Sequence, residues 1–518
     1  MGDAARGAWG AWEVHAKPQH GSFRGRGPLA IAALLATGCF EETEPPDGSG
    51  ATSGATETMG TSGGTQTGGT TTTTTTGPTT TTSSSGGDTG GGMGGAQCEP
   101  LPPPQGGAVL TVGPQDAAML PQIVLGAETG TTILLEPGSY QVSSGSGNFI
   151  TVAKDGISIR SQTGNRDDVR LDLTGASFEA AFYVQASDVT IAEITIRNPG
   201  QHAIHVVPPM DRDITGLRVY GVLIEDATRQ AIKINPPGND ANSTYADDGE
   251  VACSTVRLTD AGRPNVFKSG INCHAGAVYG LAVRGWRVRD NTFEGLWCTD
   301  ALAPFAVIFQ SNARDNVIER NRLYDCARGL AFGLFETNGG AAARDYTGEP
   351  PPPDCSYNAG HVEHFGGVIR NNFVWAGGTG IWSSSYKVDV GIGLAQACGA
   401  QVVHNTVYTT DAAAVGSIDY RFSNTTGTVG NNLVSHDLVA RDGVILGNDP
   451  AAGVFLTGNI TNVAPGDLVD PDGGDLHLTL GASARDAGEI LQSPVADDID
   501  GDPRDDGTPD VGADEFVP

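Results

Sequence analysis

One short motif recurs along the second half of the chain and constrains how it can fold. The motif is an apolar residue, two further residues, Asn, one residue and a second apolar residue, as in Val288-Arg-Asp-Asn291-Thr-Phe293. Most copies follow one another at intervals of about 26 to 34 residues, the range of solenoid repeats. A unit of this length cannot bury its apolar face alone, so consecutive units must stack. The asparagines of the copies are Asn291, Asn321, Asn371 and Asn405, with weaker copies at Asn431 and Asn459.

Two earlier units indicate what each repeat contains. Residues 191–206 and 219–234 align without a gap at an offset of about 28 residues. In both units apolar residues alternate with polar ones, as in strands with one buried face, and Val, Ile and Gly are frequent. The pattern predicts stacked coils of two or three short strands, which is an all-β parallel β-helix. We expect few helices, one of them over 116–124.

We expect the asparagine column to be structural rather than catalytic. Asn tolerates the left-handed backbone conformation that sharp corners between strands require. In stacked coils these side chains would lie about 4.8 Å apart, so their amides could hydrogen-bond in a ladder. The chain also has 74 glycines and only 6% aromatic residues, as in a narrow, turn-rich solenoid.

The N-terminal part of the chain differs from the repeats. Arg24 and Arg26 precede a short apolar run and Ala36-Thr-Gly-Cys39, which predicts an export signal with a bacterial lipobox and a lipid on Cys39. An ordinary signal cleaved nearby is the alternative. The Thr, Gly and Ser residues that follow cannot build a core, so we predict a disordered linker spanning about 40 Å. The expected divisions are signal and lipobox 1–39, linker 40–97, β-helix 98–480 and C-terminal cap 481–518.

The eight cysteines belong to a chain that we expect to be exported, which favours disulfides. The chain has no Cys-x-x-Cys spacing, so a zinc site is rejected. With Cys39 assigned to lipid, the expected pairs are Cys298–Cys326, Cys253–Cys273 and Cys355–Cys398, and Cys98 remains free.

Two long insertions interrupt the repeat, over about 235–280 and 336–366. Long loops on a solenoid often line its binding face, so their charged and imidazole side chains are candidates for chemistry. Three acidic residues of the first insertion are the candidate ligands of a Ca²⁺ ion, namely Asp247, Asp248 and Glu250. The other candidates are Lys268 and His274 in the first insertion, and Asp345, Glu349, Asp354, His361, Glu363 and His364 in the second.

The strand register suggests a second set of candidates on one outer face. If Ile204 and Ile232 point inward, His205 and Lys233 point outward and lie about 4.8 Å apart on neighbouring coils. A basic pair, an arginine and an aromatic ring would form a sugar-binding strip; the alternative is an ordinary solvated strand face. The column would continue through Ile308, Ala331 and Trp382, with Gln230 and Arg328 beside it.

The formal net charge of −30 argues against nucleic acid as a partner, because phosphate binding needs a basic surface. An acidic polysaccharide remains compatible with this charge, provided that a local basic groove or a bridging Ca²⁺ ion receives it. The protein is expected to act as a monomer that reaches a membrane only through its lipid.

The coils and their asparagine column resemble the right-handed parallel β-helix superfamily, which includes pectate lyases, polygalacturonases, chondroitinase B and alginate lyases. The resemblance covers about 109–480. Residues 320–334 are similar to a segment of uncharacterised bacterial β-helix repeat lipoproteins, and 498–515 resemble a closing motif of secreted bacterial β-helix proteins. No complete lyase or polygalacturonase signature can be matched residue by residue.

Three functions fit these features. The first is a tethered extracytoplasmic protein that binds and cleaves an acidic polysaccharide as a lyase, with a lysine removing the C5 proton and Arg328 or Ca²⁺ neutralising the carboxylate. A hydrolase would use two carboxylates, Asp247 with Glu250 or Glu336 with Glu363. The second function is non-catalytic glycan binding or adhesion, and the third is a structural surface spacer. The candidate catalytic residues are Lys233, His205, Arg328 and Lys268, and the candidate binding residues are Gln230, Trp382 and His274.

Overall fold

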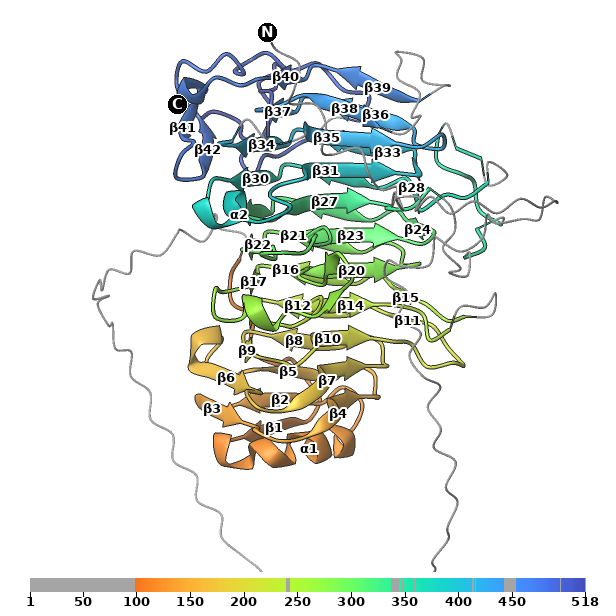
Figure 1. Ribbon diagram of the computed structural model, residues 1–518. Helices are drawn as coiled ribbons and strands as arrows, with labels where there is room; N and C mark the ends of the chain where they lie inside the picture. Colours follow the sequence, from red (N-terminus) through yellow and green to blue (C-terminus); the bar gives the residue numbers. More distant parts are fainter. Residues whose placement is uncertain are drawn as a thin grey trace, which may run out of the picture. The chain divides into compact units, whose positions relative to one another are not determined.

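The computed structural model describes most of the chain that follows the expected linker. The expected signal, the lipobox with Cys39 and the linker lie outside the described residues, as does Asp354. In the described part, strands predominate and form three long parallel sheets (Figure 1). None of the helices in this part has the length and apolarity needed to span a bilayer. The described residues are 98–238, 243–336, 344–346, 348–353, 355–356, 360–411, 414, 416–441, 453–493 and 495–517.

Successive coils contribute strands to the three sheets, which we name A, B and C. Within each sheet the spatial order of the strands follows the chain, because each coil stacks on the previous one. Sheet A comprises β1 (Val109–Val112), β2 (Thr132–Leu135), β5 (Ser158–Ser161), β8 (Thr190–Ala192), β12 (Arg218–Tyr220), β16 (Glu250–Ala252), β21 (Arg287–Arg289), β25 (Val317–Glu319), β29 (Val368–Arg370), β33 (Ala400–Val403), β36 (Gly427–Gly430) and β39 (Val454–Thr457).

Sheet B follows sheet A in each coil after a sharp corner. It comprises β3 (Gly138–Gln141), β6 (Val169–Asp172), β9 (Thr195–Arg197), β13 (Leu223–Glu225), β17 (Thr255–Arg257), β22 (Thr292–Glu294), β26 (Arg322–Tyr324), β30 (Phe373–Ala376), β34 (Thr406–Thr409), β37 (Leu433–Val434) and β40 (Ile460–Thr461).

Sheet C is reached from sheet B and leads back to sheet A through longer connections. It comprises β4 (Ser146–Val152), β7 (Ser177–Val184), β10 (His202–Val206), β14 (Ile232–Ile234), β20 (Val278–Leu281), β23 (Val307–Gln310), β27 (Arg328–Phe332), β31 (Val390–Ala395), β35 (Gly416–Arg421) and β38 (Leu438–Arg441).

Short elements lie in the connections and at the ends. The expected helix over 116–124 corresponds to a 3-10 turn, η1 (Pro114–Met119), and α1 (Leu120–Gly126) beside the first coils. The other short helical elements are η2 (Arg166–Asp168), η3 (Arg263–Asn265), α2 (Thr379–Ser383) and η4 (Pro465–Asp467). Three pairs of short strands are β11 (Ile214–Thr215) with β15 (Ala246–Asp247), β18 (Lys268–Ser269) with β19 (Asn272–Cys273), and β41 (Leu468–Asp470) with β42 (Asp475–Leu478). One small three-stranded sheet consists of β24 (Ala313–Arg314), β28 (His364–Phe365) and β32 (Ala397–Cys398).

The alternation of apolar residues in the sequence produces the core. Val219 of β12 stacks in register on Ile191 of β8 and Val251 of β16, and all three side chains are fully buried. One apolar cluster built in this way runs through the coils from Val112 to Val454. The right-handed parallel β-helix predicted from the sequence is therefore confirmed.

The asparagine ladder exists, but two of its members differ from the prediction. The side-chain amides of consecutive coils hydrogen-bond at 2.9–3.0 Å, and Asn372 and Asn432 stand where Asn371 and Asn431 were expected. Asn371 and Asn431 precede the ladder and adopt the left-handed conformation, with φ of 52° and 53°. At each of these two corners, the first Asn turns the backbone and the second Asn joins the ladder. The ladder is Asn291, Asn321, Asn372, Asn405, Asn432 and Asn459.

The disulfide prediction is correct at one of three places. Cys355 pairs with Cys398, but the structure contradicts the other two pairs and the free Cys98. Among the residues that the structure describes, the free cysteine is Cys326, whose buried thiol lies 3.7 Å from the carbonyl oxygen of Phe293. A spacing of one coil did not reveal that this side chain points into the core. The bonds in the structure are Cys98–Cys253, Cys273–Cys298 and Cys355–Cys398.

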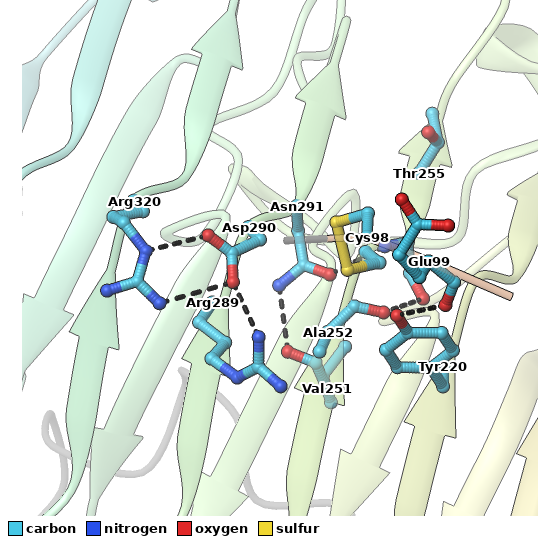
Figure 2. Close-up of a disulfide and its surroundings, with 12 residues drawn as sticks. Cys98, Glu99, Tyr220, Val251, Ala252, Thr255, Arg289, Asp290, Asn291 and Arg320 are labelled. Atoms are coloured by element: carbon cyan, nitrogen blue, oxygen red, sulfur yellow. Dashed lines mark hydrogen bonds and ion pairs between the residues drawn. A yellow bond between two sulfur atoms is a disulfide. The ribbon is translucent and has the colours of Figure 1, made fainter. Parts of the chain in front are cut away.

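The first described residues form a strap along the corner between sheets A and B. Cys98 is bonded to Cys253 at that corner, and the Tyr220 hydroxyl donates to the Glu99 carbonyl oxygen at 2.7 Å (Figure 2). Further along, the Leu101 backbone N–H donates to Glu193 at 2.6 Å. The strap therefore runs from the coil of Cys253 back toward the first coils.

The last described residues cover the same flank farther along the chain. Buried apolar residues of this segment, among them Leu476 and Val511, pack against Phe373 and Tyr408 of sheet B. The Asn371 amide donates to the carbonyl oxygen of Asp497 at 2.8 Å. The C-terminal segment thus packs against the side of several coils.

Candidate functional site

Sheet C is flanked by the long connections on both of its edges. The sheet B-to-C connections carry α2, β18 and β19, and the C-to-A connections carry β11, β15, β24 and β28. Figure 1 places α2 on one side of the sheet C strands and β11, β15, β24 and β28 on the other. The first insertion recognised in the sequence, 235–280, therefore contributes to both sides of sheet C, and the second, 336–366, lies on the side of the C-to-A connections.

His205 and Lys233 lie side by side on the outer face of sheet C. They are direct partners in the parallel register of β10 and β14, while Ile204 and Ile232 are fully buried on the inner face. The outward column continues in the other direction to Tyr183 of β7, whose ring meets that of His205 at 5.6 Å. The geometry expected from the sequence is therefore present at this pair.

Three histidines gather around Lys233 and are held in the neutral form. Burial first, and then the charge of Lys233, lower the pKa of His205 to about 4. Burial, followed by the charges of Arg229 and Lys233, lowers the pKa of His274 to about 4. Burial, followed by the effects of His205 and Lys233, lowers the pKa of His202 well below its usual value. The positive charge of this cluster at neutral pH is therefore carried by Lys233 and Arg229 and not by the histidines.

Hydrogen bonds orient two of these rings. An imidazole nitrogen of His205, Nε2, lies 2.7 Å from the Asn235 side-chain oxygen. The Nδ1 atom of His202 donates to the backbone carbonyl oxygen of Gln230 at 2.6 Å. Gln230 is buried beside the cluster and acts there through its backbone. His202 was not singled out in the sequence, although it lies on the same strand as His205.

His274 is positioned by the β18–β19 hairpin region. Its backbone N–H donates to the Phe267 carbonyl oxygen at 3.1 Å, and its ring meets the Phe267 ring at 4.9 Å. The guanidinium of Arg229 lies 4.0 Å from the centroid of the same Phe267 ring. The adjacent bond between Cys273 and Cys298 fastens this region to the next connection. The side chain of Lys268 forms an ion pair with Asp300.

The outward column continues differently from the prediction. Tyr279 follows Lys233, and Ile308 and Ala331 come next as expected. The position expected for Trp382 is taken by Gly393 of β31, whereas Trp382 lies on α2 and packs partly buried against the core. The strand β20, which lies at the end of the first insertion, and the helix α2, which lies outside the coil, were not predicted from the sequence. Long connections make the spacing of the repeat irregular there, so the position of the next strand could not be inferred.

A pocket opens at the other end of this face, around β27, β31 and β35. Arg328 is buried there and its Nε donates to Asp389 at 2.7 Å. The Arg328 guanidinium lies 5.5 Å from the ring centroid of Phe305. The strand β27 is three strands from β14, about 14 Å along the sheet, so Arg328 and Lys233 form separate groups. Phe305, Asp389, Asp419 and Arg421 carried no recognisable motif in the sequence.

The residues expected to hold Ca²⁺ are engaged by arginines. Arg344 Nη1 donates to Asp247 at 2.7 Å, and Glu250 pairs with Arg289 at 2.7 Å on sheet A. Asp248 is exposed as a residue, but partial desolvation of its carboxyl, followed by the negative charge of Asp247, raises its pKa. The structure therefore does not bring these three carboxylates together as an oxygen-rich cation site.

The acidic and imidazole candidates of the second insertion have structural partners. The buried Glu363 carboxylate meets His361 Nε2 at 2.5 Å and accepts the Ser311 backbone N–H at 3.1 Å. His364 is fully buried and stacks on Phe332 at 3.9 Å. The remaining described members are Asp345 and Glu336, which are exposed, and Glu349, which pairs with Arg284.

Among the described residues, one group of three side chains has ligand atoms close enough together for a metal ion. Its members, His477, Asp500 and Asp514, lie in the C-terminal segment, with their ligand atoms within 4.8 Å of one another. His477 is held between Asp475 and Asp500, at 2.5 and 2.8 Å, so both ring nitrogens already have carboxylate partners. This group is an internal ion-pair network of the C-terminal segment.

The three parallel sheets and the amide ladder decide the fold class. The chain has a right-handed parallel β-helix fold. Solved structures similar to it include pectate lyase Pel9A (14% identity, TM-score 0.42), with 80% of this chain and 97% of that chain covered.

Two further solved structures are similar to the chain at a comparable level of sequence identity. The alginate lyase from Paenibacillus sp. str. FPU-7 has 14% identity and a TM-score of 0.36, over 68% of this chain and 99% of that chain. A rhamnogalacturonan lyase has 13% identity and a TM-score of 0.35, over 77% and 95%. No family model matches the sequence, and no curated protein matches it. These similarities concern the fold.

Proposed function

We propose that the protein binds an acidic polysaccharide along the outer face of sheet C and cleaves it by β-elimination. The observation that carries the proposal is the in-register pair of His205 and Lys233. Lys233 and the nearby Arg229 supply positive charge for a uronate carboxylate, which is what an acidic protein needs locally to receive an acidic chain.

The chemistry can be assigned to residues of this cluster. In β-elimination a base removes the proton at C5, and a cation next to the carboxylate stabilises the charge that develops. The C4–O bond then breaks as the C4=C5 double bond forms, and the leaving oxygen takes up a proton. His205 is neutral at neutral pH because its pKa is lowered to about 4, so its imidazole can accept a proton. A bound carboxylate would counteract the charge of Lys233 and raise the proton affinity of His205. Lys233 would stabilise the carboxylate, or exchange roles with His205 as the base.

The test is turnover by the full chain on pectate, alginate, glycosaminoglycans and neutral glycans. Ultraviolet absorbance from unsaturated uronate together with new reducing ends is the expected result. Lys233→Ala and His205→Ala should each abolish turnover without unfolding. Lys154→Ala should not, because its amine bonds the Ala127 carbonyl oxygen beside the first coils. Full activity of folded Lys233→Ala would refute the assignment.

Other outcomes of the same assay separate the alternative functions. Reducing ends without ultraviolet absorbance would indicate a hydrolase, and activity lost only in Lys268→Ala would move the base to the β18–β19 hairpin. Binding without any product would identify a glycan-binding or adhesion protein. Each result names a different function for the same face.

We also propose that the protein acts outside the cytoplasm, held to the bacterial cell envelope by a lipid on Cys39. The three disulfides support this location, because such bonds persist in oxidising compartments. Mass spectrometry of the mature N-terminus tests it: a diacylglyceryl group on Cys39, lost in Cys39→Ser, is expected. A mature protein that starts at another residue would exclude lipidation.

A further inference from the structure

The outer face of sheet C is accessible at the end where His205 and Lys233 lie. One column of outward side chains crosses the stacked strands in register, from β4 through β35 (Figure 1). Thr151 of β4, Tyr183 of β7 and Lys233 of β14 are half-buried. His205 lies between Tyr183 and Lys233 in this column and is buried. Three of the four side chains from β4 to β14 therefore reach the surface.

From β20 onward the same column is buried. Tyr279 is 4% exposed, although it is the direct neighbour of the half-buried Lys233. The members that follow are all buried, namely Ile308, Ala331, Gly393 and Asp419. The outer face of sheet C thus closes between β14 and β20, one strand beyond the proposed site.

The ring of Phe305 covers the column where it is closed. Phe305 precedes β23 and packs in one apolar cluster with the outward side chains of β20, β23 and β27. The residue of the column at β31 is Gly393, and a Cβ atom there would lie 2.6 Å from the Phe305 ring. The ring therefore lies directly against the backbone of the sheet, in the space that a larger residue would fill. Phe305 itself is 5% exposed.

The space between Phe305 and the sheet is too small for a sugar unit. The pocket lined by Phe305, Gly393 and Asp419 has room for about one water molecule, about 10 Å³. Moving the ring away would expose a buried aromatic side chain, which is unfavourable. A glycan that continued from Lys233 over β20 and β23 would therefore have to leave the surface.

We propose that the polysaccharide enters this face with one of its ends, stops before Phe305 and is shortened from that end. The proposal rests on the proposed function, in which the glycan lies along sheet C. The end unit lies at Lys233, because the closed part begins one strand spacing farther on, about 4.8 Å. The rest of the glycan extends over β10, β7 and β4.

Each cleavage then produces one short fragment and one glycan shortened by that fragment. The C4=C5 double bond forms on the piece that loses its C5 proton. The other piece keeps the leaving oxygen, which takes up a proton and becomes a new reducing end. A protein that cuts in this way releases fragments of one short length from the beginning of the reaction.

The number of proteins that bind to one glycan tests the proposal without turnover. The experiment is a calorimetric titration of the full chain carrying His205→Ala with size-fractionated oligomers of pectate, alginate and a glycosaminoglycan. This variant lacks the proposed base, and the absence of new reducing ends verifies that the oligomers stay intact. We expect one protein per oligomer at every length, because each glycan has one end of the matching kind.

The outcomes separate this proposal from the proposed function. A molar ratio that rises in proportion to oligomer length would overturn the closed end, while glycan binding by sheet C would stand. Binding to none of the three polymers would overturn the proposed function and, with it, the closed end. In the product assay of the wild type, a wide range of fragment lengths early in the reaction would also overturn the closed end.

A substitution of the covering ring tests the role of Phe305 directly. Phe305→Ala, combined with His205→Ala, should raise the molar ratio above one for long oligomers. In the product assay, Phe305→Ala alone should replace the single short fragment by a range of lengths. Phe455→Ala, on β39 of sheet A, is the matched control and should change neither result. Circular dichroism verifies folding, and a folded Phe305→Ala that behaves like the control would show that Phe305 does not close the face.

Discussion

Oδ2 of Asp497 lies 2.7 Å from Nη1 of Arg320, although 177 residues separate the two in the chain. The contact fastens the C-terminal segment to the left-handed corner of a coil in the middle of the solenoid. Arg320 is 6% exposed and also bonds Asp290 of the preceding coil, so the segment ties neighbouring coils together.

Breaking this contact should loosen the C-terminal segment without destroying the coils. Asp497→Asn removes one charged hydrogen bond but leaves Arg320 its bond to Asp290, so we expect a loss of about 1–2 kcal/mol in unfolding free energy. Urea unfolding followed by circular dichroism measures it. Asp505→Asn, at an exposed position of the same segment, is the matched control; equal midpoints for the two variants would show that the contact contributes nothing.

The amide ladder should be sensitive to a single substitution at its middle. Asn321 is fully buried and its side-chain nitrogen donates to Val288, Glu319 and Asn372 at 2.9–3.0 Å. Asn321→Ala leaves several buried backbone groups without partners, so a loss of about 3 kcal/mol or more is expected. Asn265→Ala, at an exposed position whose φ is not positive, should change the unfolding free energy by less than about 0.5 kcal/mol. Similar losses for both variants would contradict the role of the ladder.

Acid should destabilise the protein through its buried histidines. His205 and His274 have pKa values of about 4 in the folded chain, against 6.5 for the free group. Between pH 6.5 and 4 the unfolded chain binds more protons, so stability falls as the pH is lowered through this window. The thermal midpoint measured from pH 7 to 4 tests this prediction. His205→Gln should reduce the dependence of the midpoint on pH in this range. A flat profile in this window would show that these rings take up protons without penalty.

Alkali should act on a different histidine with the opposite sign. Two carboxylates outweigh the effect of burial and raise the pKa of His477 to about 9. Its contribution is therefore complete below pH 6.5 and is lost as the pH rises toward 9. His477→Gln should lower the thermal midpoint at pH 6 and make it less dependent on pH between pH 6.5 and 9. If wild type and variant lose stability in parallel over that range, His477 is not the titrating group.

The bond between Cys273 and Cys298 should control order at the edge of the proposed site. It closes a 25-residue separation next to His274, so replacing both cysteines with serine should free the β18–β19 hairpin while the coils persist. Limited proteolysis should then cut near 267–273 and turnover should fall. The double variant at Cys355 and Cys398, on the opposite edge, should not expose this hairpin. Equal resistance to protease in all three proteins would exclude the prediction.

The sequence was informative where one repeat follows another closely. The units at 191–206 and 219–234 align without a gap, and their predicted register is the one in the structure, including His205 beside Lys233. At the corners, two adjacent positions both favour Asn, for different reasons. Composition alone could not decide which of Asn371 and Asn372 turns the backbone and which joins the ladder.

The remainder of the candidate site depends on contacts that have no periodicity. Tyr279 sits in a coil that looks like an insertion, because the connections that lead to β16 and to β20 are both long. The pairing of Arg328 with Asp389 joins positions 61 residues apart, and no local pattern signals it. The cysteine pairs depend in the same way on where a loop or a strap crosses a coil.

The bond between Cys98 and Cys253 has a mechanical consequence. Tension transmitted along the chain from residues before Cys98 enters the solenoid at the coil of Cys253, because the covalent bond is the first rigid connection that it meets. The coils from β1 to β12 then lie outside the loaded path and cannot be peeled off one by one from their open end. Reduction of this single bond would shift the load to the hydrogen bonds of the strap and from there to β1.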